Sequence, residues 1–573
     1  MSLPMGSSML RGGVMVETLL ASGVHDVVLA PGSRSAPIAL ALASGERQGR
    51  LRLHVRVDER SAGFLALGLA KGAGRPVAVV TTSGTAAVNL HPAIVESSYG
   101  GVPLIAVTAD RPTRLRGVGA NQTIVQPGLF GGECRFACDL TDADAVADVS
   151  AVEAAVAMAT DPTHPGPVHI NLALDEPLVD DEAVQEQAAD IVRSASTSPP
   201  TSSATKAQSV GHSIPLPENA TSPHAVIIVG DTAGFPREAA DPQAIEELSR
   251  LTGWPVISEP SGCASHLDGA LRHGPLIAAD ATFIAAHRPR IVLTIGRVGL
   301  HRSLMSLIRG ADHHIVVDPR PEGYRCDPLS TAESFLPVLP TVRDGEIARD
   351  TDWRTAWEDA DRAWAHHVEE AFEESGELDG VRIAREVGAT LRDDDLLVVG
   401  PSWPVRHVSS FAGAIRARVL ANRGTSGIDG VVSTAWGIAS VASGFTVCLI
   451  GDLTAIYDRN GLLAAPGEAH PHLVYVVIDN DGGGIFGELE QGAPRFAVDF
   501  ERVFGTPHGS DLAALLAAPG ISTRRVESVE HLREELHDAR TRVGVHVIVV
   551  AAVERHDQVA RIARMSRRDA DND

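Results

Sequence analysis

Cysteine is scarce in this sequence of 573 residues, and long apolar runs and an excess of positive charge are lacking. The five cysteines are scattered, which favours a reducing compartment over a disulfide framework. No uncharged apolar stretch approaches the ~20 residues of a membrane-spanning helix. The first residues also lack the apolar segment of a signal peptide. We therefore expect a cytoplasmic protein that does not enter membranes.

Acidic residues outnumber basic ones, and the formal net charge is −24 with a pI of about 5.4. Nucleic acids and anionic membranes are bound by basic surfaces, so this balance argues against both as partners. It does not exclude small anionic substrates, because a local group of arginines can override the charge of the whole chain.

Short runs rich in Val, Ile and Leu alternate with helical segments along the chain, as in "DVVLA", "PVAVVTT" and "PLIAVTA". This alternation is typical of parallel sheets covered by helices on both faces. We predict three doubly wound α/β domains. The predicted boundaries are residues 1–188 for the first domain, 189–224 for a Ser/Thr/Pro-rich linker, 225–345 for a central domain, 346–565 for the third domain and 566–573 for a disordered tail.

Two polar residues follow predicted strands of the third domain. Asp452 ends the run "FTVCLIGD", and Asn480 follows "HLVYVVID" 28 residues later. Ligands in open parallel sheets bind beyond the carboxyl ends of strands, so the two side chains could converge there on a cation such as Mg²⁺. Alternatively, Asp452 caps the next helix and "NDGGG" is an ordinary turn. The spacing of the two motifs on successive strands favours the first interpretation.

A Gly-Asp pair followed about 28 residues later by Asn after a strand resembles the motif of thiamine diphosphate enzymes. The resemblance implies that Asp452, Asn480 and the carbonyl oxygen of Gly482 hold Mg²⁺ or Mn²⁺ against the diphosphate. Leu453 and Asp479 depart from the commonest form of the motif, but neither change removes an implied ligand.

Glu59 follows the run "LRLHVRVD" in the first domain, where such enzymes place the glutamate that protonates the aminopyrimidine ring. Its alternative role is an ordinary acidic residue in a first helical turn. Given the metal motif, we predict the catalytic role. The resemblance also implies a homodimer or homotetramer with the cofactor between subunits.

Longer motifs narrow the resemblance. They include "APGSRSAPIALAL", "TADRPTRLRGVGANQTI" and "ANRGTSGIDGVVSTAWGIA". As a set they are similar to the 2-succinyl-5-enolpyruvyl-6-hydroxy-3-cyclohexene-1-carboxylate synthase family of menaquinone biosynthesis. That resemblance implies a carboligating transferase, which decarboxylates 2-oxoglutarate and adds the succinyl unit to isochorismate.

Both implied substrates are dicarboxylates, which arginine forks bind in bidentate fashion. Taken alone, each arginine fits a solvated surface residue better than a substrate contact. His301 stands where we associate a lysine with the family, and its role stays open. The substrate residues implied by the resemblance are Ser33, Arg34, Arg111, Asn121, Gln122, Arg302, Ser402, Arg406, Arg423, Ile485 and Phe486.

The resemblance also implies a set of cofactor-binding residues. Within it, Gly427 and Ile428 would shape the cofactor, and Ile485 and Phe486 would form an apolar wall, unless they are plain core residues. The full implied set is Glu59, Thr82, Ser402, Ser426, Gly427, Ile428, Gly451, Asp452, Leu453, Thr454, Asn480, Gly482, Gly483, Gly484, Ile485 and Phe486.

Two alternatives remain at this point. One is another thiamine diphosphate enzyme, such as a 2-oxoacid decarboxylase or an acetolactate-type synthase. The latter often binds a flavin, but "IIVGDTAGFPREA" lacks a complete G-x-G-x-x-G fingerprint. The other is a non-catalytic binding protein of the same fold, against which the intact Glu59, Asp452 and Asn480 argue.

Overall fold

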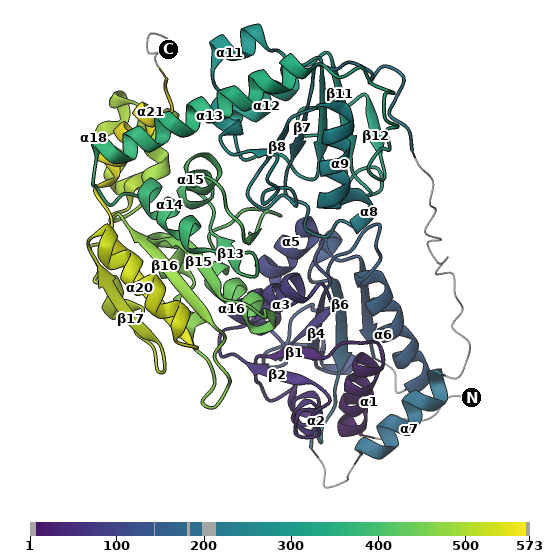
Figure 1. Ribbon diagram of the computed structural model, residues 1–573. Coiled ribbons are helices and arrows are strands. Elements are labelled where there is room, and N and C mark those ends of the chain that lie inside the picture. Colours follow the sequence, from purple (N-terminus) through teal and green to yellow (C-terminus); the bar gives the residue numbers. More distant parts are fainter. Residues whose placement is uncertain (1–6, 142–143, 180–183, 197–213, 569–573) are drawn as a thin grey trace. The chain divides into compact units, whose positions relative to one another are not determined.

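Three six-stranded sheets make up the frame of the protein (Figure 1). The computed structural model describes residues 7–141, 144–179, 184–196 and 214–568. Every pair of neighbouring strands in the sheets is parallel. The three doubly wound parallel sheets predicted from the sequence are thus confirmed.

The first sheet has the strand order β2-β1-β3-β4-β6-β5. Its inner strands are buried on both faces, because each consists largely of Val, Ile, Leu and Ala. Its strands are β1 (Asp26–Leu29), β2 (Arg52–Val55), β3 (Val77–Thr81), β4 (Leu104–Asp110), β5 (Phe136–Leu140) and β6 (Val168–Ala173). The helices of this region are α1 (Ser8–Ala21), α2 (Ala36–Arg47), α3 (Glu59–Ala73), α4 (Thr85–Val88), α5 (His91–Gly100), α6 (Ala145–Ala159) and α7 (Gln185–Ser196).

The second sheet has the order β12-β11-β10-β7-β8-β9. Its strands are β7 (Ala225–Val229), β8 (Val256–Ser258), β9 (Ala270–Leu271), β10 (Ile291–Ile295), β11 (His313–Val317) and β12 (Ser334–Leu336). The helices of this region are α8 (Arg237–Ala240), α9 (Pro242–Thr252), α10 (Gly274–Ile277), α11 (Ala281–Ala286), α12 (Arg302–Gly310) and α13 (Thr351–Glu374). Helix α13 buries Trp353, Trp357 and Trp364, so a long aromatic face packs into the core beside this sheet.

The third sheet has the order β14-β13-β15-β16-β18-β17. Its strands are β13 (Leu396–Val399), β14 (Arg418–Leu420), β15 (Thr446–Gly451), β16 (Leu473–Asp479), β17 (Ser522–Val526) and β18 (Val545–Ala551). The helices that belong with it are α14 (Gly380–Thr390), α15 (Trp403–Phe411), α17 (Asp452–Tyr457), α18 (Ala497–Phe500), α19 (Leu512–Leu515), α20 (Val529–Thr541) and α21 (Arg555–Met565).

Each sheet order contains a switch point, where successive connections leave in opposite directions. It lies between β1 and β3, between β7 and β10, and between β13 and β15. Such points open a crevice at the carboxyl ends of the strands. In the second sheet, buried Asp231 and half-buried Arg297 form an ion pair just after β7 and β10. The other two switch points carry the residues predicted for the site.

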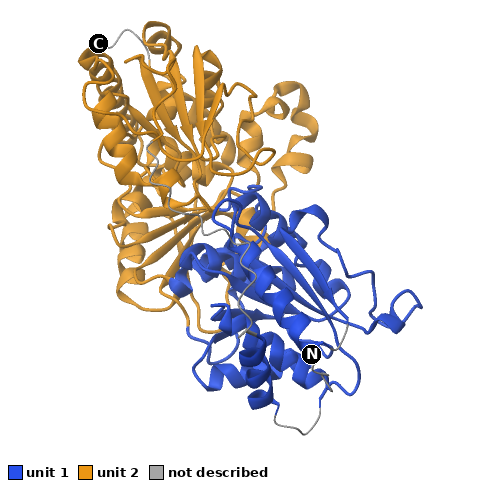
Figure 2. Cartoon of the chain, turned by 90° about the vertical axis from the view of Figure 1, so that its right-hand side faces the viewer, with its two compact units in different colours: residues 1–211, 422–441, 458–469 blue, residues 212–421, 442–457, 470–573 orange. Residues whose placement is uncertain are grey.

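The chain divides into two compact units, coloured separately in Figure 2. Unit 1 comprises Met1–Gly211, Asn422–Val441 and Asp458–Ala469, and unit 2 comprises the rest. Unit 1 therefore contains the first sheet, α16 (Val431–Val441) and the short helix η3 (Arg459–Leu462). Unit 2 contains the other two sheets.

Helix α16 packs against α3 within unit 1, and glycines make the contact close. A Cβ atom on Gly68 would lie 2.1 Å from the carbonyl oxygen of Thr434. A Cβ on Gly437 would lie 2.3 Å from the carbonyl oxygen of Leu65. The two backbones thus meet where only glycine fits.

The domain boundaries predicted from the sequence stay predictions. Helix α7 runs across the predicted boundary at residue 188. Residues 197–213 of the predicted linker lie outside the described residues, as do residues 569–573 of the predicted tail. Among the helices of the described residues, none combines the length and the apolar character needed to cross a bilayer.

Candidate active site

Asp452 lies at the switch point of the third sheet, as the first residue of α17. Its side chain is 2 % exposed, and Oδ2 accepts hydrogen bonds from the backbone amides of Asn480 at 3.2 Å and Gly482 at 2.8 Å. Oδ1 accepts a hydrogen bond from the amide of Leu453 at 2.6 Å. Asp452 therefore fastens the end of β15 to the turn after β16, which a simple helix cap would not do.

The side-chain amide of Asn480 and the carbonyl oxygen of Gly482 lie beside Oδ2 of this carboxylate. The side-chain oxygen of Asn480 lies 3.1 Å from Oδ2 of Asp452 and 2.9 Å from the carbonyl oxygen of Gly482. With the amide turned over, its NH₂ group would donate to both oxygens. A carboxylate, an amide oxygen and a carbonyl oxygen are hard donors of the kind that Mg²⁺ and Mn²⁺ take. These residues therefore fit the predicted metal.

The glycines after Asn480 are required by packing as well. Gly482 has a φ of 131°, and a Cβ there would lie 2.1 Å from the carbonyl oxygen of Gly505. A Cβ on Gly483 would meet the carbonyl oxygen of Phe504 at 2.6 Å. One on Gly484 would enter the ring of Trp403. The turn is thus pressed against its surroundings, with no room for side chains.

His508 and Asp479 face the same carboxylate, and the sequence reasoning missed His508. Its Nε2 lies 3.5 Å from Oδ2 of Asp452 and 3.6 Å from Oδ1 of Asp479. The nearby carboxylate of Asp452 raises the pKa of His508. Burial and the charge of Asp452 raise the pKa of Asp479. No local motif marks His508, because it lies 56 residues beyond Asp452 (508 minus 452) in a loop.

Glu59 is the first residue of α3, and its neighbour Asp58 takes the capping role. Oδ1 of Asp58 accepts hydrogen bonds from the amides of Arg60 at 2.9 Å and Ser61 at 3.3 Å. Within the described part of the chain, the half-buried carboxylate of Glu59 makes no hydrogen bond or ion pair. Asp58 therefore bonds the free amides of the first helical turn, and the carboxylate of Glu59 is available to a ligand.

The switch point of the first sheet brings predicted substrate residues together. Arg34 follows β1, is 7 % exposed and donates to the carbonyl oxygen of Leu174 at 3.0 Å. Arg111 follows β4, and its guanidinium donates to Oγ of Ser83, just after β3. Burial lowers the pKa of Arg111, and the charge of nearby Arg34 lowers it further. A bound anion would offset the repulsion between the two guanidinium groups.

Gln122 joins the same group through the backbone. Its Nε2 donates to the carbonyl oxygen of Ser83 at 2.9 Å, and Oγ of Ser83 donates to the carbonyl oxygen of Gln122 at 3.1 Å. Thr82 lies against Gly32, where a Cβ would meet the Cβ of Thr82 at 2.5 Å. Ser33 and Asn121 are exposed on the adjoining loops.

The segment 423–428 belongs to unit 1 and carries Arg423, Ser426, Gly427 and Ile428. All four are half-buried. Ser426 has a φ of 61°, while Gln122 and Ser402 have φ values of 55° and 68°. Left-handed backbone is costly for non-glycine residues and gathers at functional sites. Three predicted site residues share this strain.

In unit 2, Ser402 precedes α15 at the end of β13, and Arg406 lies one turn further on. Arg406 donates to the carbonyl oxygen of Ser402 at 2.9 Å. Arg302, at the start of α12, is 80 % exposed on its side chain and lies 3.4 Å from Oε1 of Glu490. The long distance and the exposure make this a weak pair.

Ile485 and Phe486 lie on the short helix η4 (Gly484–Glu488), and both are half-buried. Ile485 packs against the core beside the second sheet, and the ring of Phe486 lies 5.8 Å from that of Phe504. Ile485 thus combines core contact with an exposed part, while Phe486 contacts another half-buried ring, so neither interpretation from the sequence is excluded. Gly451, Leu453 and Thr454 surround Asp452 in sequence, and Thr454 is buried.

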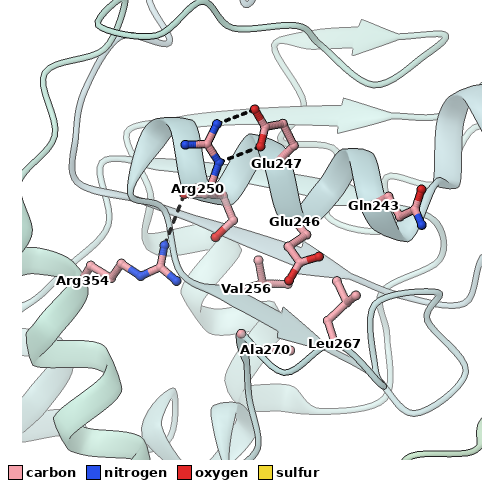
Figure 3. A pocket seen from close by; sticks show the side chains of 10 residues that line it. Gln243, Glu246, Glu247, Arg250, Val256, Leu267, Ala270 and Arg354 are labelled. Carbon is pink, nitrogen blue, oxygen red and sulfur yellow. Dashed lines mark hydrogen bonds and ion pairs between the residues drawn. The ribbon is translucent and has the colours of Figure 1, made fainter. Parts of the chain in front are cut away.

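A separate pocket of about 290 Å³ lies between α9 and the neighbouring β8 and α13 (Figure 3). Val256 and Leu267 contribute apolar wall, and Arg250 pairs with Glu247 at the rim. The residues predicted for the site do not line it.

Two family models match the chain. Residues 11–129 match the N-terminal TPP binding domain of thiamine pyrophosphate enzymes, and residues 410–550 match the C-terminal TPP binding domain. Thiamine pyrophosphate is the same compound as thiamine diphosphate. Together with the three parallel sheets, these matches define the chain as a thiamine diphosphate-dependent enzyme.

Curated relatives narrow the class. The 2-succinyl-5-enolpyruvyl-6-hydroxy-3-cyclohexene-1-carboxylate synthase of Thermobifida fusca is 39% identical over 91% of this chain and 92% of its own length. Its counterpart in Saccharopolyspora erythraea is 38% identical over 96% of both chains. The one in Kineococcus radiotolerans is 40% identical over 89% of this chain and 90% of its own length. The chain belongs to the 2-succinyl-5-enolpyruvyl-6-hydroxy-3-cyclohexene-1-carboxylate synthase family.

Proposed function

We propose that this enzyme decarboxylates 2-oxoglutarate with thiamine diphosphate and transfers the succinyl unit to isochorismate in a 1,4-addition. The products are 2-succinyl-5-enolpyruvyl-6-hydroxy-3-cyclohexene-1-carboxylate and CO₂, in menaquinone biosynthesis. The names of the relatives support this assignment. The observation that carries it in the molecule is the convergence of the Asp452 carboxylate, the Asn480 side-chain amide and the carbonyl oxygen of Gly482.

The residues of unit 2 would hold the charged end of the cofactor. Asp452, Asn480 and the carbonyl of Gly482 would bind Mg²⁺ or Mn²⁺, which would neutralise the diphosphate. When bound, the thiazolium ring of thiamine diphosphate serves as the electron sink for decarboxylation. Glu59 would move a proton at the ring nitrogen that it contacts, and its unpaired carboxylate suits that task.

The arginines would select and orient the substrates. Arg34 and Arg111 follow strands of the same sheet, and the charge of Arg34 lowers the pKa of Arg111, which suits a carboxylate shared between them. Arg406, Arg423 and the more exposed Arg302 would supply further carboxylate contacts. Ile485 and Phe486 would exclude water, so that the succinyl unit reaches isochorismate rather than a proton.

An omission assay tests the reaction. The purified protein is incubated with thiamine diphosphate, Mg²⁺, 2-oxoglutarate and isochorismate, and mass spectrometry follows the adduct and CO₂. We expect the adduct only when all four are present. Release of CO₂ without consumption of isochorismate would indicate a 2-oxoacid decarboxylase instead.

We infer further that the enzyme acts in the cytoplasm as a homodimer or homotetramer with shared sites. Its cysteines, all of them free, are compatible with that compartment. The test mixes two inactive variants, Glu59→Gln and Asp452→Ala, after subunit exchange. If each site takes Glu59 from one chain and Asp452 from the other, mixed dimers contain one intact site and regain activity. No recovery in verified mixed dimers would place both residues in one chain's site.

A further inference from the structure

Hydrogen bonds fix the residues before and after Arg423, while the guanidinium of Arg423 itself has no bonded partner among the described residues. Within the described residues, the side chain of Arg423 makes no hydrogen bond or ion pair, although it is half-buried. Its neighbours Asn422, Gly424 and Thr425 are all bonded to other parts of unit 1. Most other predicted substrate arginines, by contrast, already have a partner within the chain.

Glu96 on α5 holds the side that follows Arg423. Its carboxylate is buried with 2 % exposure. Oε1 accepts a hydrogen bond from the amide of Gly424 at 2.8 Å. Oε2 accepts from the amide of Thr425 at 2.7 Å and from its Oγ1 at 2.9 Å. One carboxylate thus fixes two successive peptide groups, and hydrogen bonds to a charged acceptor are the strong ones.

Lys71 on α3 holds the side that precedes Arg423. It is one of only two lysines in the sequence, and it is 8 % exposed. Its Nζ lies 3.2 Å from Oδ1 of Asn422 and 4.0 Å from Oε1 of Glu96. Nδ2 of Asn422 donates to Oγ1 of Thr434 at 3.0 Å. Buried charges are tolerated only when they are paired, and here each compensates the other.

The backbone of α5 supports the same segment from below. A Cβ on Gly424 would lie 2.5 Å from the carbonyl oxygen of Glu96 and 2.8 Å from the amide nitrogen of Gly100. The segment is therefore in backbone contact with the helix and has little room to shift towards it.

We propose that Glu96 and Lys71 are positioning residues, which fix the backbone at 422–425 so that Arg423 presents its guanidinium to a substrate carboxylate. The proposal rests on the proposed function, in which Arg423 binds a dicarboxylate. Fixing the backbone beforehand removes the ordering cost from binding, so that a free guanidinium binds more tightly. Neither residue touches the substrate itself.

The main test replaces Glu96 with Gln. The side-chain amide of this variant keeps one acceptor oxygen, but its NH₂ group faces a backbone N–H. Two donors cannot bond to each other, so the hydrogen bond to Gly424 or to Thr425 is lost. We expect KM for at least one dicarboxylate substrate to rise about tenfold, with a smaller change in kcat. The affinity for thiamine diphosphate should stay within about threefold, because Asp452 and Asn480 lie in other segments.

A double-mutant cycle separates positioning from plain destabilisation. In an Arg423→Met background, Glu96→Gln should raise KM no further, since Glu96 acts through Arg423. Equal effects of Glu96→Gln in both backgrounds would overturn the proposal. Glu386→Gln is the matched control, because Glu386 is 4 % exposed and bonded to Arg533 on α20. It should leave KM unchanged.

Hydrogen exchange tests the positioning role without relying on the proposed reaction. Hydrogen exchange of the amides of Gly424 and Thr425 should quicken in Glu96→Gln and in Lys71→Met, while exchange in α16 stays slow. Unchanged exchange at these two amides would overturn the positioning role whatever the substrate is. Faster exchange in a protein whose wild type does not use the two dicarboxylates would instead refute the reaction assignment.

Discussion

The amide of Gly482 donates a hydrogen bond of 2.8 Å to Oδ2 of Asp452, so two neighbouring strand ends are joined through one carboxylate. The same oxygen lies beside the side-chain oxygen of Asn480. Asp452 thus has a structural role beside its proposed metal-binding role, and no single substitution separates the two completely.

Replacing Asp452 with Ala should weaken both roles. We expect the dissociation constant for thiamine diphosphate in Mg²⁺ to rise about 10- to 100-fold. The free energy of unfolding should fall by about 1–3 kcal/mol, because two buried amides lose their acceptor. Titration calorimetry with and without EDTA measures the first effect. Asp393→Asn is the control, since Asp393 only pairs with Arg416 on the surface. Unchanged affinity in Asp452→Ala would leave Asp452 with the structural role alone.

Replacing Glu59 with Gln should abolish most turnover while keeping the fold. Because Asp58 caps α3, the helix does not depend on the charge of Glu59. We expect kcat to fall by ~10²–10⁴-fold with little change in cofactor affinity. Asp58→Ala gives the reverse pattern, a loss of about 1 kcal/mol in stability with a much smaller effect on kcat. Activity of Glu59→Gln equal to wild type would remove Glu59 from the proton transfer.

Replacing Gly482 with Ala should disturb the turn that ends β16. The new Cβ would collide with the carbonyl oxygen of Gly505, and a φ of 131° is unfavourable for alanine. We expect a loss of about 1–3 kcal/mol in stability together with weaker cofactor binding. Gly376→Ala is the control, because a Cβ there meets nothing within 4 Å. Equal melting temperatures of the two variants would contradict the packing argument.

Asp458 should make stability depend on pH in an unusual direction. It accepts hydrogen bonds from the amide of Ser433 at 2.7 Å and from Oγ of Ser61 at 3.1 Å, and burial raises its pKa to about 6. Between pH ~4 and ~6 the folded state keeps a proton that the unfolded state has released. The free energy of unfolding therefore falls as pH rises through this window, by about 3 kcal/mol from this group.

Asp458→Asn removes the titrating group while keeping an acceptor oxygen. The difference in urea midpoint between this variant and wild type should therefore change between pH 4 and pH 6.5, with the wild type losing more. Parallel midpoints across that range would show that folding does not raise the pKa of Asp458.

The strands and the positions of the predicted cofactor motifs could be predicted because each depends on residues that are neighbours in the sequence. Val-rich runs identify buried parallel strands, and a polar residue at the end of such a run lies at the edge of the sheet where ligands bind. Asp452 and Asn480 were placed at strand ends in this way, whereas the substrate role of Arg34 came from the family resemblance. His508 and Glu96 were not predicted, because each acts on a segment far away in the sequence and leaves no local pattern.

One signal for the missed residues was present. Lysine occurs only twice in a chain that otherwise uses arginine, and Lys71 stands inside the Gly/Ala-rich helix α3. A cation in such a helix predicts a buried partner. Which partner it meets depends on how 422–441 folds back onto the first sheet, and residue patterns alone do not specify so distant a contact.

The glycine contact between α3 and α16 has a consequence for how the enzyme can vary. Glu59 begins α3, and the segment of Arg423 leads into α16, so the proposed proton-transfer residue and the proposed substrate arginine lie on two helices whose backbones touch. A larger residue at Gly68 or Gly437 would displace both at once. Under the proposed roles, a substitution at this contact that alters substrate binding by Arg423 should also alter proton transfer by Glu59. The two properties are therefore expected to change together.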